Sequence, residues 1–417
     1  PKGAGRVAAA LPAVSAAADY EEQVRQKTRC IASIFAPLAE DGRLDGGLLG
    51  RGMEVRRSPE RHFRARTVVP VGEPPAGDVD GGLFRLAARA DGSLELVTTL
   101  SVDTLLRPIA AALPRLPALL GPGAVGGGLR AGLRCLKLHA AEGGEPPQLL
   151  LCLIYGPEGQ VPGQEALGEL RAALAAEVAR GWAACDVVVM AQARGRQACA
   201  PPGRDYVDER IAIGGRALPL KYRQPFGQFS NPNPHIAKAT AEWLIDVIRT
   251  SVHGGGAAAR PDLLELYCGA GSHTVALAPM FRHVLAVEIN RHLVEAARVN
   301  VAENGLENVT VVRAPSEDFC KRVLRRRSYQ LRGEDGSTRM QLEFACTIVD
   351  PPRAGLDKLT REAVGGYDHV LYVSCNPEAL MRDLGELLDT HEVCRMVLLD
   401  HFPFSAHAEV AVHLRRR

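Results

Sequence analysis

The sequence of 417 residues lacks the markers of several protein classes. Its longest apolar candidate, residues 105–120, is broken by arginines and prolines and falls short of the roughly 18 to 20 residues that a membrane helix needs. Neither sign of charge dominates, since 50 basic residues stand against 48 acidic ones. We therefore expect no membrane partner, and a bound RNA would have to be held by local basic patches rather than by overall charge.

The ten cysteines are isolated, and no Cys-x-x-Cys pair occurs among them. Zinc sites and iron–sulfur clusters usually take ligands from such closely spaced pairs. We therefore expect neither a metal ion nor an iron–sulfur cluster. Scattered single thiols in a chain of this size also favour a reducing compartment.

Residues 1–18 are rich in alanine and contain no acidic residue. This composition is typical of a disordered low-complexity linker and also of the end of an organelle transit peptide. We accordingly expect the protein in the cytoplasm, or in a plastid or mitochondrial matrix if the segment is a targeting remnant.

The rest of the sequence has two unlike parts. Residues 19–225 mix short apolar runs with glycine- and proline-rich joints, and amphipathic periodicity predicts helices over 19–38 and 164–180. Strand-like runs occur at 148–155 and 186–190. This part is expected to form an α+β domain.

Residues 226–417 have a regular rhythm in which strand and helix patterns alternate. Strands are expected at 262–267, 283–289, 309–314, 346–350 and 369–374. Helices are expected near 273–281, 291–304, 316–327, 357–364 and 378–388. The alternation predicts a mostly parallel, doubly wound α/β sheet. Two final strands, 392–400 and 409–415, should form an antiparallel hairpin at the sheet edge because no helix separates them.

A glycine-rich turn follows the first of these strands, with Gly269 and Gly271 spaced as G-x-G. Glu288 closes the next strand 19 residues after Gly269, a spacing at which an acid accepts hydrogen bonds from ribose hydroxyls. The third glycine of a dinucleotide fingerprint is missing, since position 274 is threonine. The turn therefore favours an adenosyl ligand without phosphate, S-adenosylmethionine, over an ordinary strand-to-helix turn beside a solvated acid.

Two further strand ends carry candidate site residues. The fourth strand ends in Asp350, and the prolines that follow predict a rigid loop that places Asp350 at the ligand rim. Arg353 stands where enzymes that methylate amines often have an aromatic residue, which indicates contact with a phosphate or a carbonyl. Cys375 follows the fifth strand and precedes a helix, whose positive N-terminus would lower the thiol pKa. The alternative for Cys375 is a buried structural cysteine.

These residues suggest a reaction at uracil C5, which is too weak a nucleophile to be methylated directly. A thiolate that adds to C6 makes C5 nucleophilic, and a base must then remove the C5 proton. Glu409, in the segment that joins the last two strands, is the candidate base. The alternatives are that Glu409 is a solvated loop acid and that His407 accepts the proton.

With these motifs assembled, the sequence resembles the TrmA family of RNA uracil-5-methyltransferases, specifically its tRNA branch. The resemblance runs from about Tyr20 to Leu414 and is carried chiefly by these segments: Leu264–Gly269, Val349–Asp357, Ser374–Pro377 and Phe402–Glu409. It implies a C-terminal Rossmann-like, class I methyltransferase domain over 226–417 and an N-terminal RNA-binding domain over 19–225. It also implies methylation of uridine at position 54 in the T loop of tRNA.

The resemblance implies Cys375 as nucleophile and Glu409 as base. The positions that would contact S-adenosylmethionine or frame its site are Asn231, Tyr267, Gly269, Gly271, Ser272, Glu288 and Asp350. The sequence departs from the family where Asn231 replaces glutamine and Ser272 replaces asparagine. The segment before Glu409 departs as well, since it is less rich in histidine.

Arginines gather around an aromatic pair in residues 56–66, and this cluster could hold phosphates and stack unpaired bases. The expected RNA contacts are Arg57, Arg61, His62, Phe63, Arg64, Arg66 and Arg353. The alternative for the cluster is a solvated strand face.

We expect a monomer whose N-terminal part grips the T arm. Two other hypotheses stay open: the same chemistry on ribosomal or other RNA, and a tRNA-binding folding aid with vestigial methylation.

Overall fold

The computed structural model describes residues 19–50, 52–72, 83–253, 260–323, 328–332 and 338–417. The expected linker or targeting remnant at 1–18 lies outside these ranges. The chain forms two compact units. One comprises the chain up to Ser58 together with His235–Arg417, and the other is Pro59–Pro234.

This division differs from the expected boundary near residue 225, because the segment up to Ser58 joins the C-terminal part. Helix α1 (Tyr20–Glu40) packs against α10 (Pro377–Leu387). Strand β1 (Glu54–Arg56) pairs in parallel with β17 (His391–Leu399). The expected terminal hairpin is present, but β1 covers the edge that β17 would otherwise expose.

The C-terminal unit is built on one mixed sheet with the strand order β1-β17-β18-β16-β15-β11-β12-β13, and β14 pairs with β15. The remaining strands are β11 (Asp262–Leu266), β12 (Val284–Glu288), β13 (Val309–Arg313), β14 (Ser328–Arg332), β15 (Thr338–Val349), β16 (His369–Ser374) and β18 (Glu409–Arg416). Strands β11, β12, β13, β15 and β16 are parallel, whereas β18 runs antiparallel to β16 and β17. The predicted parallel sheet and antiparallel hairpin are therefore confirmed.

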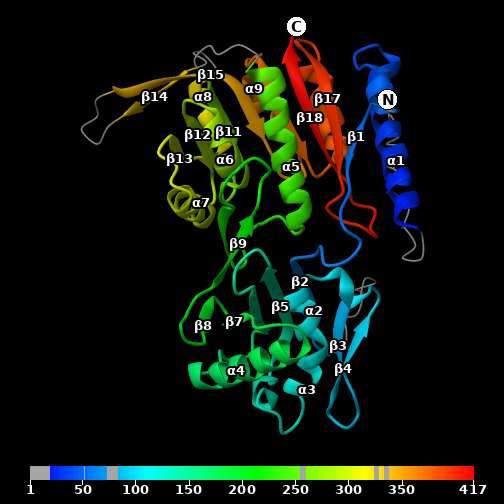
Figure 1. The fold of residues 1–417 in the computed structure, drawn as a ribbon, viewed down its shortest axis with the longest axis vertical. Coiled ribbons are helices and arrows are strands. Elements are labelled where there is room, and N and C mark those ends of the chain that lie inside the picture. The colour runs from blue at the N-terminus through cyan, green and yellow to red at the C-terminus, as the bar shows by residue number, and fades with distance from the viewer. Residues whose placement is uncertain (1–18, 51, 73–82, 254–259, 324–327, 333–337) are drawn as a thin grey trace, which may run out of the picture. The chain divides into compact units, whose positions relative to one another are not determined.

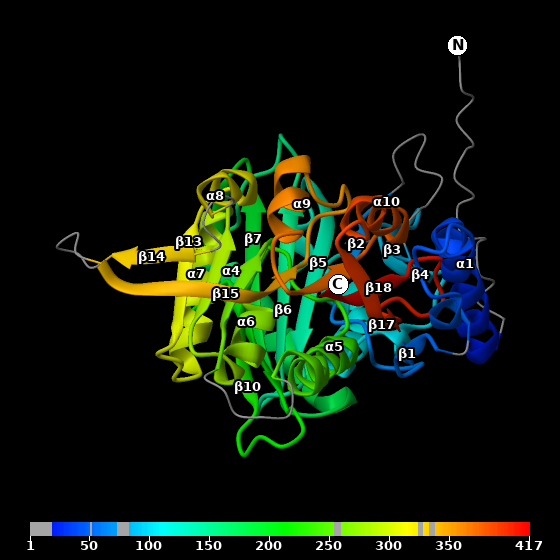
Figure 2. The same ribbon diagram turned by 90° about the horizontal axis from the view of Figure 1, so that it is seen from above.

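Helices cover both faces of this sheet, as the doubly wound pattern requires. Helices α8, α9 and α10 lie on one face, and α5, α6 and α7 lie on the other (Figure 2). Their bounds are α5 (Pro234–Val247), α6 (Ser272–Leu277), α7 (Arg291–Glu303), α8 (Ser316–Val323) and α9 (Lys358–Val364). Apolar side chains of α1, α8, α9 and α10 share one core cluster with the strands.

The other unit is an α+β domain with a five-stranded sheet in the order β2-β5-β6-β7-β8 (Figure 1). These strands are β2 (Arg66–Pro70), β5 (Leu133–Ala141), β6 (Gln148–Tyr155), β7 (Asp186–Ala193) and β8 (Arg196–Cys199). Two hairpins accompany the sheet, β3 (Phe84–Ala88) with β4 (Leu94–Thr98) and β9 (Tyr206–Ile211) with β10 (Leu220–Pro225). The helices are α2 (Arg107–Ala112), α3 (Leu116–Leu119) and α4 (Gln164–Gly181).

The broken apolar run at 105–120 supplies α2 and α3 of this second unit, and most of its leucines are buried in the core. Within the described ranges, no helix has the length and apolarity needed to cross a membrane.

Trp243 of α5 links three elements of the C-terminal unit. Its ring is fully buried, its Nε1 donates to Glu54 Oε1 at 3.1 Å, and the Arg395 guanidinium lies 5.5 Å from the ring centroid. Arg395 also pairs with Glu54 at 2.7 Å. The tryptophan therefore joins α5 to β1 and β17.

We predict that Trp243→Ala lowers the free energy of unfolding by about 3–5 kcal/mol, because it leaves a cavity and removes the indole N–H that Glu54 accepts. The control is Trp182→Ala, which removes a ring that is 36% exposed and should change stability by only about 0.5 kcal/mol. Urea unfolding followed by circular dichroism measures both. Equal losses in the two variants would contradict the linking role of Trp243.

Candidate active site

The strand register of the C-terminal sheet brings the predicted site residues to one edge. Leu266 at the end of β11 pairs with Val287 and Val349, and Val349 pairs with Tyr372. The residues that follow, Tyr267, Glu288, Asp350 and Cys375, therefore leave the sheet at the same edge. Because β18 is antiparallel, it begins there with Glu409, and Val410 pairs with Ser374.

The turn after β11 has a backbone shape that suits glycine. Gly269 and Gly271 have φ values of 57° and 81°, in the left-handed region. A Cβ at Gly269 would meet no atom within 4 Å, so the turn has open space on that side. Asn300 of α7 donates to the Ala270 carbonyl at 2.9 Å and braces the turn. The turn thus leaves room for a ligand against its backbone.

Glu288 holds this turn from the neighbouring strand. Its Oε2 accepts the Gly269 N–H at 3.0 Å, and its Oε1 accepts the Ile289 and Asn290 N–H groups, each at 2.8 Å. A carboxylate has about four acceptor positions, so Oε2 keeps one for a ligand hydroxyl. This remaining acceptor position fits a ribose hydroxyl of S-adenosylmethionine.

Cys375 is partly exposed, as a nucleophile needs to be. Burial, followed by the charges of Glu409 and Asp350, raises the pKa of its thiol, while Arg353 opposes the rise. The expectation that the helix N-terminus would lower this pKa is therefore wrong in direction. The reason is that the thiol is partly buried and that two carboxylates also act on it.

Glu409 lies in a protected position beside Cys375. Burial and then the charge of Asp350 raise its pKa to about 8, and Arg353 lowers it. Its Oε2 lies 3.2 Å from Nε2 of His401, whose side chain is buried. Glu409 is therefore no solvated loop acid, and its pKa lies near the range in which a general base operates.

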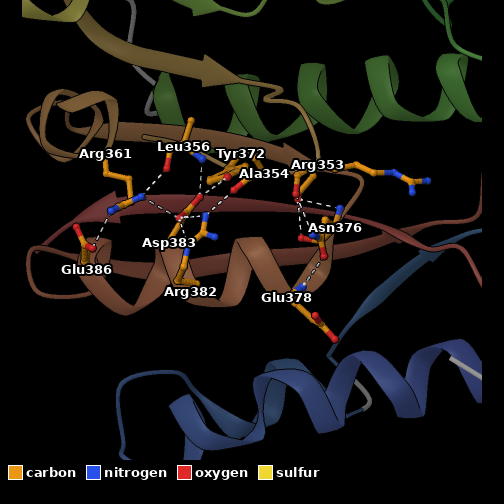
Figure 3. Close-up of polar contacts among 11 residues, drawn as sticks. Arg353, Ala354, Leu356, Arg361, Tyr372, Asn376, Glu378, Arg382, Asp383 and Glu386 are labelled. Carbon is orange, nitrogen blue, oxygen red and sulfur yellow. Dashed lines mark hydrogen bonds and ion pairs between the residues drawn. The ribbon is translucent and has the colours of Figure 1, made fainter. Parts of the chain in front are cut away.

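A buried carboxylate, Asp383 of α10, joins the loop after β15 to strand β16 (Figure 3). Its Oδ2 accepts the Leu356 N–H at 2.8 Å and the Tyr372 hydroxyl at 2.7 Å. Arg361 and Arg382 pair with its Oδ1.

Helix α10 and its N-cap residue make two more contacts with the loop after β15. Arg382 donates to the Ala354 carbonyl at 2.7 Å, and Asn376 donates to the Arg353 carbonyl at 2.9 Å. These contacts fix the loop that carries Asp350 against the loop that carries Cys375. Figure 3 shows the side chain of Arg353 pointing away from this network.

Comparisons with known proteins agree with this geometry. A family model described as tRNA (Uracil-5-)-methyltransferase matches residues 148–417. A tRNA/tmRNA (uracil-C(5))-methyltransferase of Aeromonas salmonicida is 33% identical over 403 residues, which cover 96% of this chain and 95% of that protein. The chain belongs to the tRNA (uracil-5-)-methyltransferase family. The predicted family and methyltransferase fold are thereby confirmed.

Another relative aligns with this chain over a similar length. The enzyme of the same description from Neisseria gonorrhoeae is 30% identical over 399 residues, covering 96% of this chain and 99% of that protein. Among solved structures, Pyrococcus abyssi tRNA (uracil-54, C5)-methyltransferase in complex with S-adenosyl-L-homocysteine has a TM-score of 0.62 at 18% identity. The superposition covers 97% of this chain and 86% of the Pyrococcus chain, and the similarity concerns the fold.

Three polar residues near this site, Glu265, His273 and His401, were not singled out in the sequence; Glu265 and His401 are buried and His273 is partly buried. Glu265 lies within β11, accepts from Thr274 at 2.6 Å, and has a pKa raised to about 7 by burial. Burial disfavours the charged form of His273, but Asp350, 3.3 Å away, outweighs it and raises the His273 pKa. Glu265 could have been noticed because an acid is unusual in a strand of a parallel sheet that is buried on both faces. His273 and His401 gave no such signal.

The other expected cofactor positions differ in their surroundings. Ser272 is the exposed first residue of α6. Tyr267 has φ 61° and its ring packs against the core cluster, so it frames the turn. Asn231 belongs to the second unit, where its Oδ1 accepts the Asn233 N–H at 3.1 Å.

The arginine cluster at 56–66 is less exposed than expected. Phe63 is only 2% exposed, so its ring is a core residue and is not available to stack on a base. Arg66 donates to the carbonyls of Gln228 and Ser230, and burial lowers its pKa to about 10. Arg66 therefore holds the segment that leads to Asn231.

Other members of the cluster also have protein partners. Burial lowers the pKa of Arg64, which donates to the Arg66 carbonyl at 3.2 Å. His62 Nδ1 lies 3.1 Å from the Leu105 carbonyl. Arg57 pairs with Glu21 at 3.1 Å. Arg57, Arg61 and Arg353 are the exposed members of the expected RNA contacts, and the Arg61 side chain is 76% exposed.

No group of three or more histidine, cysteine or acidic side chains that could hold a metal ion occurs in the part of the chain that the structure describes.

We predict that Gly355→Ala destabilises the protein by about 2–4 kcal/mol and slows methyl transfer. Gly355 has φ 77°, and a Cβ there would lie 2.5 Å from Arg382 Nη2 and 2.6 Å from Asp383 Oδ2, disturbing the loop network. Thermal unfolding and single-turnover rates measure the effect.

Gly305→Ala is the matched control. Gly305 has φ 64° but would place its Cβ in open space, so only the backbone strain of about 1 kcal/mol is expected. Equal losses of stability and rate in the two variants would show that the network around Asp383 adds nothing.

Proposed function

We propose that this protein methylates C5 of uridine 54 in the T loop of tRNA through a covalent bond between Cys375 and uracil C6. The observation that carries the proposal is the meeting of a partly exposed thiol and a buried acid, Cys375 and Glu409, at the sheet edge that bears the glycine turn. Neither residue would be needed for methylating a nitrogen or oxygen nucleophile.

In the first step, the Cys375 thiolate adds to C6, and the electrons of the C5=C6 bond move onto C5 and the O4 carbonyl. S-adenosylmethionine, when bound, supplies the methyl group that the electron-rich C5 attacks, leaving S-adenosylhomocysteine. Gly269, Gly271 and Glu288 would hold the nucleoside part of this cofactor. Asp350 and the family positions Ser272 and Tyr267 would complete its surroundings.

In the second step, the Glu409 carboxylate removes the proton from the methylated C5. The electrons of that C–H bond restore the C5=C6 double bond, and the Cys375 thiolate leaves C6. Atoms and charge balance, because the carboxylate gains the proton that C5 loses. His407 is less suited to this role, since it is exposed whereas the Glu409 side chain is only 16% exposed.

The RNA side of the proposal rests on accessible cations. Arg61 and Arg353 would contact phosphates, with Arg57 and His62 as further contacts of the T arm. The target uridine must leave the stacked loop to reach Cys375, so we propose that it is flipped out. We further propose that the protein acts as a monomer.

We predict that Glu409→Gln accumulates a covalent protein–RNA adduct, because elimination of the thiolate requires loss of the C5 proton. The experiment incubates the variant with labelled S-adenosylmethionine and an unmodified tRNA transcript, followed by a denaturing gel and mapping of the methylated nucleotide. Cys375→Ala is the control and should form neither adduct nor product while binding RNA within several fold of the wild type. Normal turnover and no adduct in Glu409→Gln would reject the assigned base, and product mapped to another RNA position would reject the T-loop target.

We predict that single-turnover release of product rises with pH through about 8, the pKa of Glu409. Only the carboxylate accepts a proton, and below its pKa the carboxylate fraction falls about tenfold per pH unit. The raised pKa of Cys375 acts in the same direction on the first step. The experiment uses tRNA whose uridines carry tritium at C5 and covers pH 6 to 9. The appearance of adduct reports the first step, and the release of tritium reports the second. A release rate that is independent of pH over this range would contradict the role of Glu409.

A further inference from the structure

The segment that leads to Glu409 is held by a helix from the other end of the chain. Residues 400–408 connect β17 to β18, and Figure 1 shows this red loop beside the blue helix α1. Tyr20, Gln23 and Lys27 of α1 contact the loop, and their spacing of three and four residues puts them on one face of the helix.

The central contact is a buried ion pair. Lys27 Nζ lies 2.6 Å from Asp400 Oδ1, and their side chains are 2% and 1% exposed. The same Nζ donates to the Phe402 carbonyl at 2.8 Å. One ammonium group therefore fixes both a side chain and the backbone at the start of the loop.

Two further contacts complete the attachment. The Tyr20 hydroxyl donates to Asp400 Oδ2 at 2.7 Å and accepts the Ser58 N–H at 2.9 Å. Gln23 Oε1 accepts the Phe404 N–H at 3.0 Å, at a residue whose φ of 62° is unusual for a side chain of this size. The loop is thus held at three points, Asp400, Phe402 and Phe404.

This attachment reaches the site through one residue. His401 follows Asp400 directly, is buried, and places its Nε2 3.2 Å from Glu409 Oε2. Burial, and then the charge of His273, lowers the His401 pKa to about 3, so the imidazole is neutral. A neutral imidazole nitrogen either donates to a carboxylate or accepts from a carboxylic acid, depending on the tautomer. His401 can therefore form a hydrogen bond with Glu409 in either charge state of Glu409.

We propose that α1 is a positioning element for the base: Lys27 and Tyr20 fix Asp400, which sets His401 against Glu409. This proposal rests on the proposed role of Glu409 in removing the C5 proton. A buried ion pair is a poor means of stabilisation compared with apolar residues of the same volume. Its directional contacts instead select one conformation of the loop.

The experiment compares Tyr20→Phe and Lys27→Met with a matched control on the same helix, Arg25→Met. Arg25 is 58% exposed and pairs only with Glu22 among the ion pairs of the described residues. In each variant, adduct formation at Cys375 and tritium release from C5 are measured in single turnovers, with thermal unfolding as a check of folding. Tyr20→Phe removes one oxygen atom and keeps the ring, so it remains informative if Lys27→Met does not fold.

We expect Tyr20→Phe to slow tritium release about fivefold and Lys27→Met at least about tenfold, with accumulated adduct in both. Adduct formation should stay within about twofold of the wild type, because Cys375 is held by other contacts. Arg25→Met should leave both steps within the same range.

Equal slowing of both steps in Tyr20→Phe, or unchanged tritium release, would overturn the positioning role. Glu409→Gln separates this outcome from failure of the proposed function. If Glu409→Gln traps adduct while Tyr20→Phe releases tritium normally, only the role of α1 is rejected. If Glu409→Gln also turns over normally, the assigned base itself is rejected.

Discussion

The parallel register of β11, β12, β15 and β16 is the constraint on which the site depends. Parallel strands that pair without slippage end at one edge, so the residues that follow them meet there however far apart they lie in sequence. The antiparallel strand β18 adds Glu409 by starting at that edge. A slip of one residue in β18 would turn Glu409 to the opposite face of the sheet.

The cluster at this edge concentrates acids around a thiol. Burial, and after it the negative charge of neighbouring carboxylates, makes ionisation less favourable and raises the pKa values of both Cys375 and Glu409. A raised thiol pKa lowers the thiolate fraction, but it also makes the thiolate that forms a stronger nucleophile. Arg353 opposes both shifts, so a phosphate that neutralised this arginine would raise them further.

Much of the C-terminal unit could be predicted from local patterns. The alternation of strands and helices, the glycine turn, and the residues Cys375, Asp350 and Glu288 all follow from sequence neighbours. The pKa of Cys375 could not be predicted this way, because the helix start is a local feature whereas the opposing carboxylates come from other strands. Phe63 was misjudged for a related reason, since arginines on both sides do not reveal that the ring itself is buried.

By itself, the sequence determined the family and the succession of strands and helices along the C-terminal part, because both are encoded in short motifs and in hydrophobic periodicity. Only the tertiary structure decided that α1 and β1 belong to the C-terminal unit, and that His401, His273 and Asp383 surround or support the site. Their contacts join residues that are distant in the chain, and no local sequence pattern specifies the hydrogen-bond partner of such a polar group. The pairing of Lys27 with Asp400 is the clearest case, since its two charges lie at opposite ends of the chain and become neighbours only when the sheet is complete.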